Sequence, residues 1–251
     1  MGNLESSKLP QDVAIVKANL PSLGPSSRII RRRQLFGRGS QRPNLIPRID
    51  SASVYVAGLI GLCSAFTVAY WATVARGRKQ GNWEPLKFIK RNFVCSVNNV
   101  KSGHWWVVLT CSFAHFNPLH LIFNMWVLWD VGRVFVRIFG ARAFVGTWFV
   151  SAITGSLGSL YWERHKNSDN MPEFGGSLGS SSAIFGLMFA QYTFMPYTPL
   201  QVHLIPALYV GASVYCLYSG SLPSIGHAGH LGGMAGGVAT CFLLLRRMFR
   251  R

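Results

Sequence analysis

Apolar residues are gathered into six runs, and polar or basic connections separate them. The runs cover residues 54–75, 118–136, 144–161, 181–195, 203–218 and 228–245. Several approach the roughly 20 apolar residues that a helix needs to cross the hydrocarbon core of a bilayer. The pattern therefore predicts an all-α, polytopic membrane protein, with a bundle of six transmembrane helices over residues 51–251.

The connection after the first run, residues 76–103, is polar and basic. It ends in the amphiphilic stretch His104-Trp105-Trp106-Val107-Val108-Leu109-Thr110. Tryptophan side chains prefer the interface between membrane and water. We therefore expect this first loop to lie on the membrane surface.

Residues 1–50 form a basic leader without a strong apolar run. Five prolines interrupt the leader, and it has seven arginines but no acid between Val13 and Ile49. We expect it to be mostly disordered. An arginine-rich, acid-free leader resembles a mitochondrial transit segment. Glu5 and Asp12 count against that reading, and the first residues also fit the loose myristoylation pattern. Processing of the leader therefore stays open.

The formal net charge is +17, and most of the 25 lysines and arginines lie in the tails and connecting loops. This placement indicates that the basic residues orient the protein in a membrane. No nucleic-acid-binding motif accompanies the charge, so we do not expect a nucleic-acid partner. With six spans both termini share one side, which carries most of the bases and is therefore the inner side. The five cysteines form no CxxC pair, so we expect no metal site and no cofactor.

Four polar residues lie near the beginnings of the second, fourth and sixth runs: His120, Asn124, Ser181 and His230. These three runs all cross from the outer to the inner side, so the four residues are expected at similar depth in the outer half of the bilayer. Because polar groups inside a span are costly, they are candidates for function.

The remaining chemistry narrows the class of enzyme. The spans lack the carboxylate pair of an aspartyl protease, and the chain has no His-Glu-x-x-His motif. A serine nucleophile needs a base, and the pattern leaves a two-residue arrangement of Ser181 and His230. Gly229, Gly233 and Gly237 recur every fourth residue. This spacing predicts a glycine-lined face for close helix packing.

Three motifs occur in order on the second, fourth and sixth runs. They are His120-x-x-x-Asn124, the stretch GSSSAIFG at 179–186, and His230-Leu231-Gly232-Gly233-x-x-x-Gly237. Together they resemble the motifs of the rhomboid intramembrane serine proteases. The resemblance implies that Ser181 is the nucleophile and His230 its base. It also implies an oxyanion hole built from His120, Asn124 and the backbone N–H of Ser181.

The resemblance further implies transmembrane protein substrates, cut near the outer membrane face. The stretch 92–129 is similar to the mitochondrial presenilin-associated branch of the family, which favours the mitochondrial inner membrane; secretory-pathway membranes are the alternative. A second functional hypothesis is a catalytically silent rhomboid-like protein that binds membrane clients. The physiological substrate and the oligomeric state stay open.

Overall fold

The computed structural model describes residues 51–166, 176–194, 200–220 and 226–248. The leader and its predicted disorder therefore lie outside the described residues, as does most of the polar connection between the third and fourth apolar runs.

The described chain is built of helices, which confirms the predicted all-α class. In chain order they are α3 (Ser51–Gln80), α4 (Glu84–Phe93), α5 (Val97–Lys101), α6 (Val107–Thr110), the 3-10 helix η1 (Cys111–Phe113), α7 (Pro118–Phe139), α8 (Ala141–His165), α9 (Ser181–Phe194), α10 (Leu200–Ser219) and α11 (His227–Met248). Each predicted apolar run coincides with one long helix. The observed helices α3 and α8 extend several residues further into the polar flanks.

Three helices of the described chain, α3, α7 and α8, are long and apolar enough to cross a membrane. Helix α9 has 14 residues, fewer than a typical span requires. The protein is thus a polytopic helical bundle, and its count of six spans remains a prediction.

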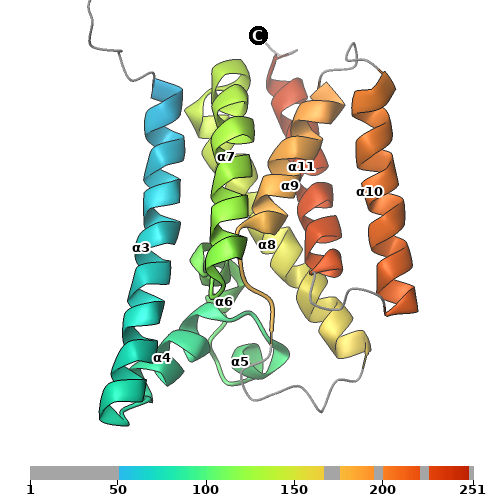
Figure 1. Cartoon of the computed structure of the whole chain (residues 1–251). Coiled ribbons are helices and arrows are strands. Elements are labelled where there is room, and N and C mark those ends of the chain that lie inside the picture. Colours follow the sequence, from blue (N-terminus) through green and yellow to red (C-terminus); the bar gives the residue numbers. More distant parts are fainter. Residues whose placement is uncertain (1–50, 167–175, 195–199, 221–225, 249–251) are drawn as a thin grey trace, which may run out of the picture. The chain divides into compact units, whose positions relative to one another are not determined.

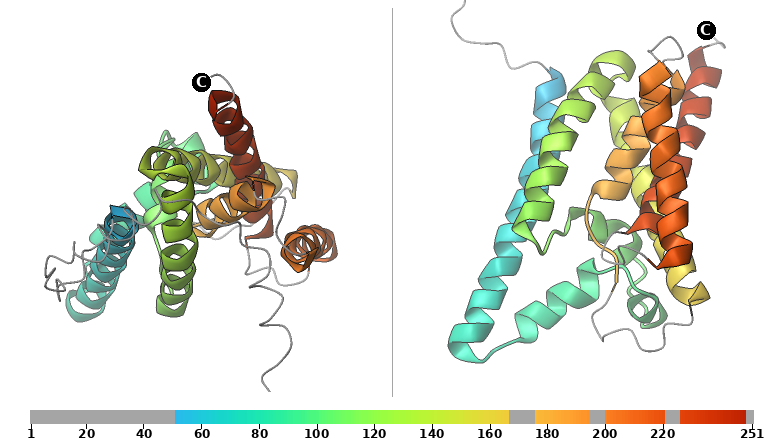
Figure 2. Two further views of the ribbon diagram at one scale, coloured as in Figure 1. Left: turned by 90° about the horizontal axis from the view of Figure 1, so that it is seen from above. Right: turned by 45° about the vertical axis from the view of Figure 1, so that its right-hand side comes forward.

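Helices α7, α9 and α11 run in one direction, and α3, α8 and α10 run in the other (Figure 1). Helix α3 lies at one edge of the bundle beside α7, and α10 lies at the opposite edge beside α11 and α9 (Figures 1 and 2). Because α7, α9 and α11 begin in the same half of the bundle, the residues at their first turns can meet there.

The centre of the bundle is the packing of α8, α9 and α11. Small residues bring these helix backbones together. A Cβ added at Gly186 would collide with the Ser151 side chain and the carbonyl oxygen of Gly233, and one at Gly232 would collide with the carbonyl oxygen of Thr154. Close approach of backbones through small residues is the packing mode expected between helices in lipid.

Helix α3 buries a narrow stripe of its surface against the bundle. The buried residues Val56, Cys63 and Val74 lie at intervals close to multiples of the helical repeat, whereas Leu62 and Val68 are exposed. A continuous apolar outer face of this kind suits a helix that contacts lipid.

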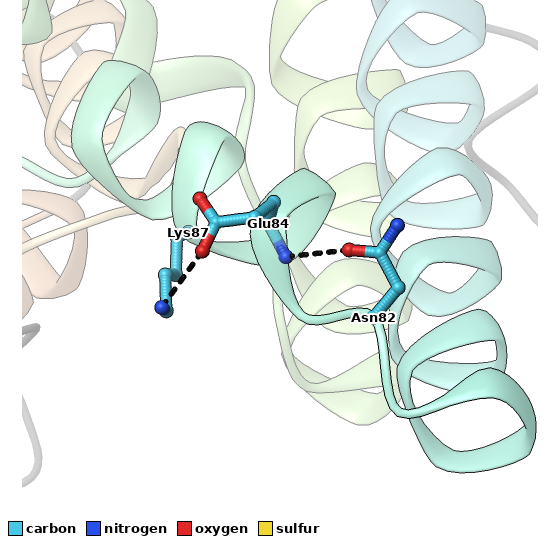
Figure 3. A network of polar contacts seen from close by, with 3 residues as sticks. All are labelled: Asn82, Glu84 and Lys87. Carbon is cyan, nitrogen blue, oxygen red and sulfur yellow. Dashed lines mark hydrogen bonds and ion pairs between the residues drawn. The ribbon is translucent and has the colours of Figure 1, made fainter.

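A tight polar turn joins α3 to α4 (Figure 3). The side-chain oxygen of Asn82 accepts a hydrogen bond from the Glu84 N–H at 3.1 Å, and Glu84 forms an ion pair with Lys87 at 2.8 Å. The ammonium of Lys87 holds the pKa of the Glu84 carboxyl below its usual range. The exposed contacts set the start of α4, the helix that opens the first loop.

Candidate active site

The turn that leads into α9 is held by backbone hydrogen bonds to the first loop. Cys95 and Ser177 form an antiparallel bridge, with N–H to oxygen distances of 3.0 and 2.8 Å. The Gly179 N–H donates to the carbonyl of Cys111 at 2.9 Å. These bonds fix the chain just ahead of Ser181, the first residue of α9.

Gly179 has a backbone conformation that favours glycine, with φ of +111°. A Cβ at this position would lie 2.7 Å from Cε1 of His120. The imidazole of His120 therefore packs directly against the turn, and any larger residue at Gly179 would displace it.

Ser181 and His230 meet between α9 and α11. The Oγ of Ser181 lies 2.8 Å from Nε2 of His230, within the range expected for a hydroxyl bonded to imidazole. Ser181 is half-buried and His230 is buried. This contact is the geometry that a serine nucleophile and its base require.

Two aromatic residues surround the imidazole of His230. The hydroxyl of Tyr209 on α10 lies 2.8 Å from Nδ1 of His230. The ring of Phe185, one turn after Ser181 on α9, lies 4.6 Å from the imidazole centre. Neither aromatic residue is among the site residues predicted from the sequence. The position of Tyr209 inside an apolar run could have indicated its role, because a buried tyrosine hydroxyl usually has a hydrogen-bond partner.

His120 and Asn124 share one face of α7 close to its start. The side-chain amide of Asn124 donates to the carbonyl of His120 at 2.9 Å, which fixes the amide and leaves its second N–H to point elsewhere. Asn124 is buried and His120 is half-buried. His120 reaches the nucleophile turn through its contact with Gly179.

A second serine–histidine contact lies directly beside the first. The N–H of Ser180 donates to Nε2 of His115 at 3.2 Å, and the Ser180 hydroxyl lies 3.3 Å from the same nitrogen. The ring of His115 also meets that of His120 edge-on at 5.2 Å. Both Ser180 and His115 are fully buried, and burial lowers the pKa of His115 to about 4. The imidazole of His115 is therefore neutral near pH 7.

The three regularly spaced glycines of α11 all lie at close helix contacts. A Cβ added at Gly233 or Gly237 would collide with the backbone of α9, at the carbonyls of Ser182 and Gly186 respectively. One at Gly229 would lie 2.6 Å from the Ser159 hydroxyl of α8. The glycines thus let the first turns of α9 and α11 approach closely enough for one hydrogen bond to join Ser181 to His230.

The comparisons with known proteins assign this arrangement to a family. A family model described as the Rhomboid domain matches residues 102–247, more than half of the chain. The chain belongs to the rhomboid family. The match includes all the residues of α7, α8, α9 and α10 and nearly all of α11, and so every polar residue of the site described above.

Similar proteins come from bacteria, fungi and animals. The chain is 28% identical over 144 residues to the rhomboid protease GluP of Bacillus subtilis, covering 55% of this chain and 26% of that protein. It is 31% identical over 140 residues to the mitochondrial Rhomboid protein 1 of Saccharomyces cerevisiae, covering 52% and 39%. It is 26% identical over 136 residues to the mitochondrial presenilin-associated rhomboid-like protein A of Danio rerio, covering 51% and 34%. The alignments thus span only about a quarter to two fifths of these relatives.

Proposed function

We propose that this rhomboid-family protein is an intramembrane serine endopeptidase that cleaves single-span membrane proteins near the outer membrane face. The observation that carries the proposal is the 2.8 Å contact between Ser181 Oγ and His230 Nε2 at the first turns of two adjacent helices. Membership in a family whose members include a protein named as a protease supports it.

In the proposed reaction the imidazole of His230 takes the hydroxyl proton of Ser181 at Nε2. The Oγ atom then attacks the carbonyl carbon of the substrate peptide bond, and the carbonyl oxygen gains the negative charge. When the C–N bond breaks, His230 returns the proton to the leaving amine. Water repeats the sequence on the acyl-enzyme and releases the serine.

The negative oxygen needs hydrogen-bond donors, and three are proposed. The N–H of Ser181 belongs to the first turn of α9, where backbone N–H groups have no acceptor within the helix. The side chains of His120 and Asn124 come from the adjacent start of α7. Donors fixed before the reaction stabilise developing charge without reorganising. The packing of His120 on Gly179 and the bond from Asn124 to the His120 carbonyl supply that rigidity.

The substrates are proposed from the same geometry. A transmembrane helix must unwind locally before a serine can reach one of its peptide bonds. We therefore expect substrates with glycine, serine or proline near the outer end of the span, and small residues at the cut. A substrate series in which helix-breaking residues made no difference to the rate would contradict this expectation.

The deciding experiment uses purified protein in detergent and a fluorescent single-span peptide. Wild-type protein should cleave the peptide, and Ser181→Ala and His230→Ala should both be inactive while unfolding at the wild-type temperature. Undiminished cleavage by either variant would remove the mechanism. A wild-type protein that binds the peptide without cutting it would establish instead the catalytically silent alternative.

We further propose that the protein resides in the mitochondrial inner membrane. The proposal rests on the basic leader, which has no acid between Val13 and Ile49, and on similarity to proteins named as mitochondrial. Residues 1–50 fused to a soluble reporter should carry it into mitochondria, and replacing Arg31, Arg32 and Arg33 by glutamate should stop import. A reporter that stayed in the cytosol would favour secretory-pathway membranes.

A further inference from the structure

The base of the proposed dyad has polar partners on both ring nitrogens, and they come from different helices. Nε2 of His230 lies 2.8 Å from the Ser181 hydroxyl of α9, and Nδ1 lies 2.8 Å from the Tyr209 hydroxyl of α10. A base whose second nitrogen is hydrogen-bonded is held in a defined orientation.

The face of the imidazole is also covered. The ring of Phe185 lies 4.6 Å from His230 at 41° and 4.5 Å from Tyr209 at 28°. Because Phe185 follows Ser181 by four residues on α9, it lies on the same helix face as the nucleophile. Phe185 thus packs against both rings and restrains their rotation, while the Tyr209 hydroxyl offers a polar contact to Nδ1.

We propose that Tyr209 is a positioning residue for His230, and that it acts by accepting a hydrogen bond from Nδ1 when Nε2 receives the serine proton. This inference rests on the proposed protease function. In the imidazolium both ring nitrogens carry hydrogen and both donate. The hydroxyl oxygen of Tyr209 then faces a charged donor, so the contact is stronger in the transition state than in the resting enzyme.

The tyrosine takes no proton in this scheme. The hydrogen on Nδ1 stays on the imidazole throughout, and the only proton that moves is the one exchanged between Ser181, His230 and the leaving amine. A neutral hydroxyl stabilises the imidazolium less than a carboxylate does. Removing the hydroxyl should therefore lower the rate by about tenfold, the scale of one hydrogen bond to a charged group.

Exposure distinguishes Tyr209, in the middle of α10, from the two tyrosines nearer the end of that helix. Tyr215 is 69% exposed and Tyr218 is 79% exposed, whereas Tyr209 is half-buried. Tyr209 therefore faces the bundle, and its hydroxyl makes a polar contact between α10 and the site. One of the contacts that orient the base therefore depends on α10 staying beside α11.

The test is Tyr209→Phe, because phenylalanine keeps the ring that stacks on Phe185 and loses only the hydroxyl. The matched control is Tyr215→Phe, which removes an exposed hydroxyl from the same helix. With the fluorescent single-span peptide, Tyr209→Phe should lower kcat about tenfold and leave KM within twofold. Its unfolding temperature should match wild type, and Tyr215→Phe should equal wild type in every measurement.

A second measurement follows the rate at which a fluorophosphonate labels Ser181, which needs the base but no transmembrane substrate. Tyr209→Phe should slow labelling by the same factor as cleavage. Wild-type kcat and labelling in Tyr209→Phe would overturn the inference and leave the protease intact. A loss that appeared in KM and unfolding temperature, with kcat unchanged, would also overturn it. Failure of wild-type protein to cleave or to be labelled would instead overturn the proposed function itself.

Discussion

Two neighbouring serines each contact a buried histidine, yet the two contacts differ in the exposure of the serine and in the partners of the histidine. Ser180 and His115 join the turn before α9 to the segment before α7, and both are fully buried. Ser181 and His230 join the first turns of α9 and α11, and Ser181 is half-buried.

The Ser180 contact uses the histidine as a structural acceptor. The backbone N–H of Ser180 donates to Nε2 of His115, so the lone pair of Nε2 is engaged. The single hydrogen of the neutral imidazole therefore lies on the other ring nitrogen, Nδ1. With Nε2 engaged by a backbone donor, His115 is placed to shape the turn and not to take the proton of a serine hydroxyl.

The Ser181 contact is the one that we propose to react. Nε2 of His230 faces a side-chain hydroxyl and not a backbone N–H, and the opposite nitrogen has the Tyr209 hydroxyl as its partner. The comparison teaches that a serine–histidine contact suggests a nucleophile only together with the surroundings of the pair. For Ser181 the proposal joins the 2.8 Å contact to the exposure of the serine and to the partners on both ring nitrogens of His230.

The largest expected difference between the two pairs is in turnover. Ser181→Ala should lower cleavage by about a thousandfold or more, because removing a nucleophile leaves only the residual catalysis of binding and the oxyanion hole. Ser180→Ala should keep at least about a third of the wild-type rate, because the backbone bond to His115 remains. Rates of the single-span peptide measure both. Equal losses of cleavage rate in the two variants would contradict the proposal that Ser181 is catalytic and Ser180 structural.

The next effect concerns the donors beside Ser181. Asn124→Ala and His120→Ala should each lower kcat by about 10²–10³, the usual cost of one oxyanion donor, with a smaller change in KM. Steady-state kinetics separates the two parameters. Wild-type turnover in both variants would place the oxyanion hole elsewhere.

The Ser181 pair also depends on how closely α9 and α11 pack. Gly237→Ala places a methyl group against the Gly186 carbonyl, and we expect a loss of about 3 kcal/mol in the free energy of unfolding, typical of overpacking. The control is Gly146→Ala on α8, where an added Cβ meets nothing within 4 Å. It should be neutral or slightly stabilising. Unfolding in detergent followed by circular dichroism would compare the two, and equal stability would refute the contact.

The smallest expected effect is a pH dependence of the free energy of unfolding that comes from His115 of the buried pair. His115 has an ordinary pKa near 6.5 when unfolded and about 4 when folded. Between these values the unfolded state binds more protons, so stability is present above about pH 6.5 and is lost as the pH falls toward 4. The loss from pH 7.5 to 5 should be about 2 kcal/mol. His115→Gln should be less stable at pH 7.5 but lack this part of the pH dependence. An identical pH slope in wild type and variant would contradict it.

Much of the helical architecture could be predicted from the order of residues. Long apolar runs can satisfy their backbone groups in a membrane only by forming helices or closed barrels. Each predicted run therefore coincides with a helix, and the ends moved by a few residues because flanking polar residues continue the helical turn. The pairing of Ser181 with His230 was also predicted from the sequence, from a serine near one helix start, a histidine near another and the resemblance to the rhomboid motifs, and the structure places the two side chains 2.8 Å apart.

What the tertiary structure alone decided is which groups surround those residues. Ser180 and Ser181 are adjacent and chemically identical, so apart from the motif resemblance the sequence does not tell which hydroxyl faces His230 and which lies fully buried. Tyr209 looks like Tyr215 in the sequence, because both are tyrosines in one apolar helix. Their roles depend on the rotation of α10 about its axis and on its contact with α11. These properties arise from packing between helices far apart in the chain, which local hydrophobicity does not encode.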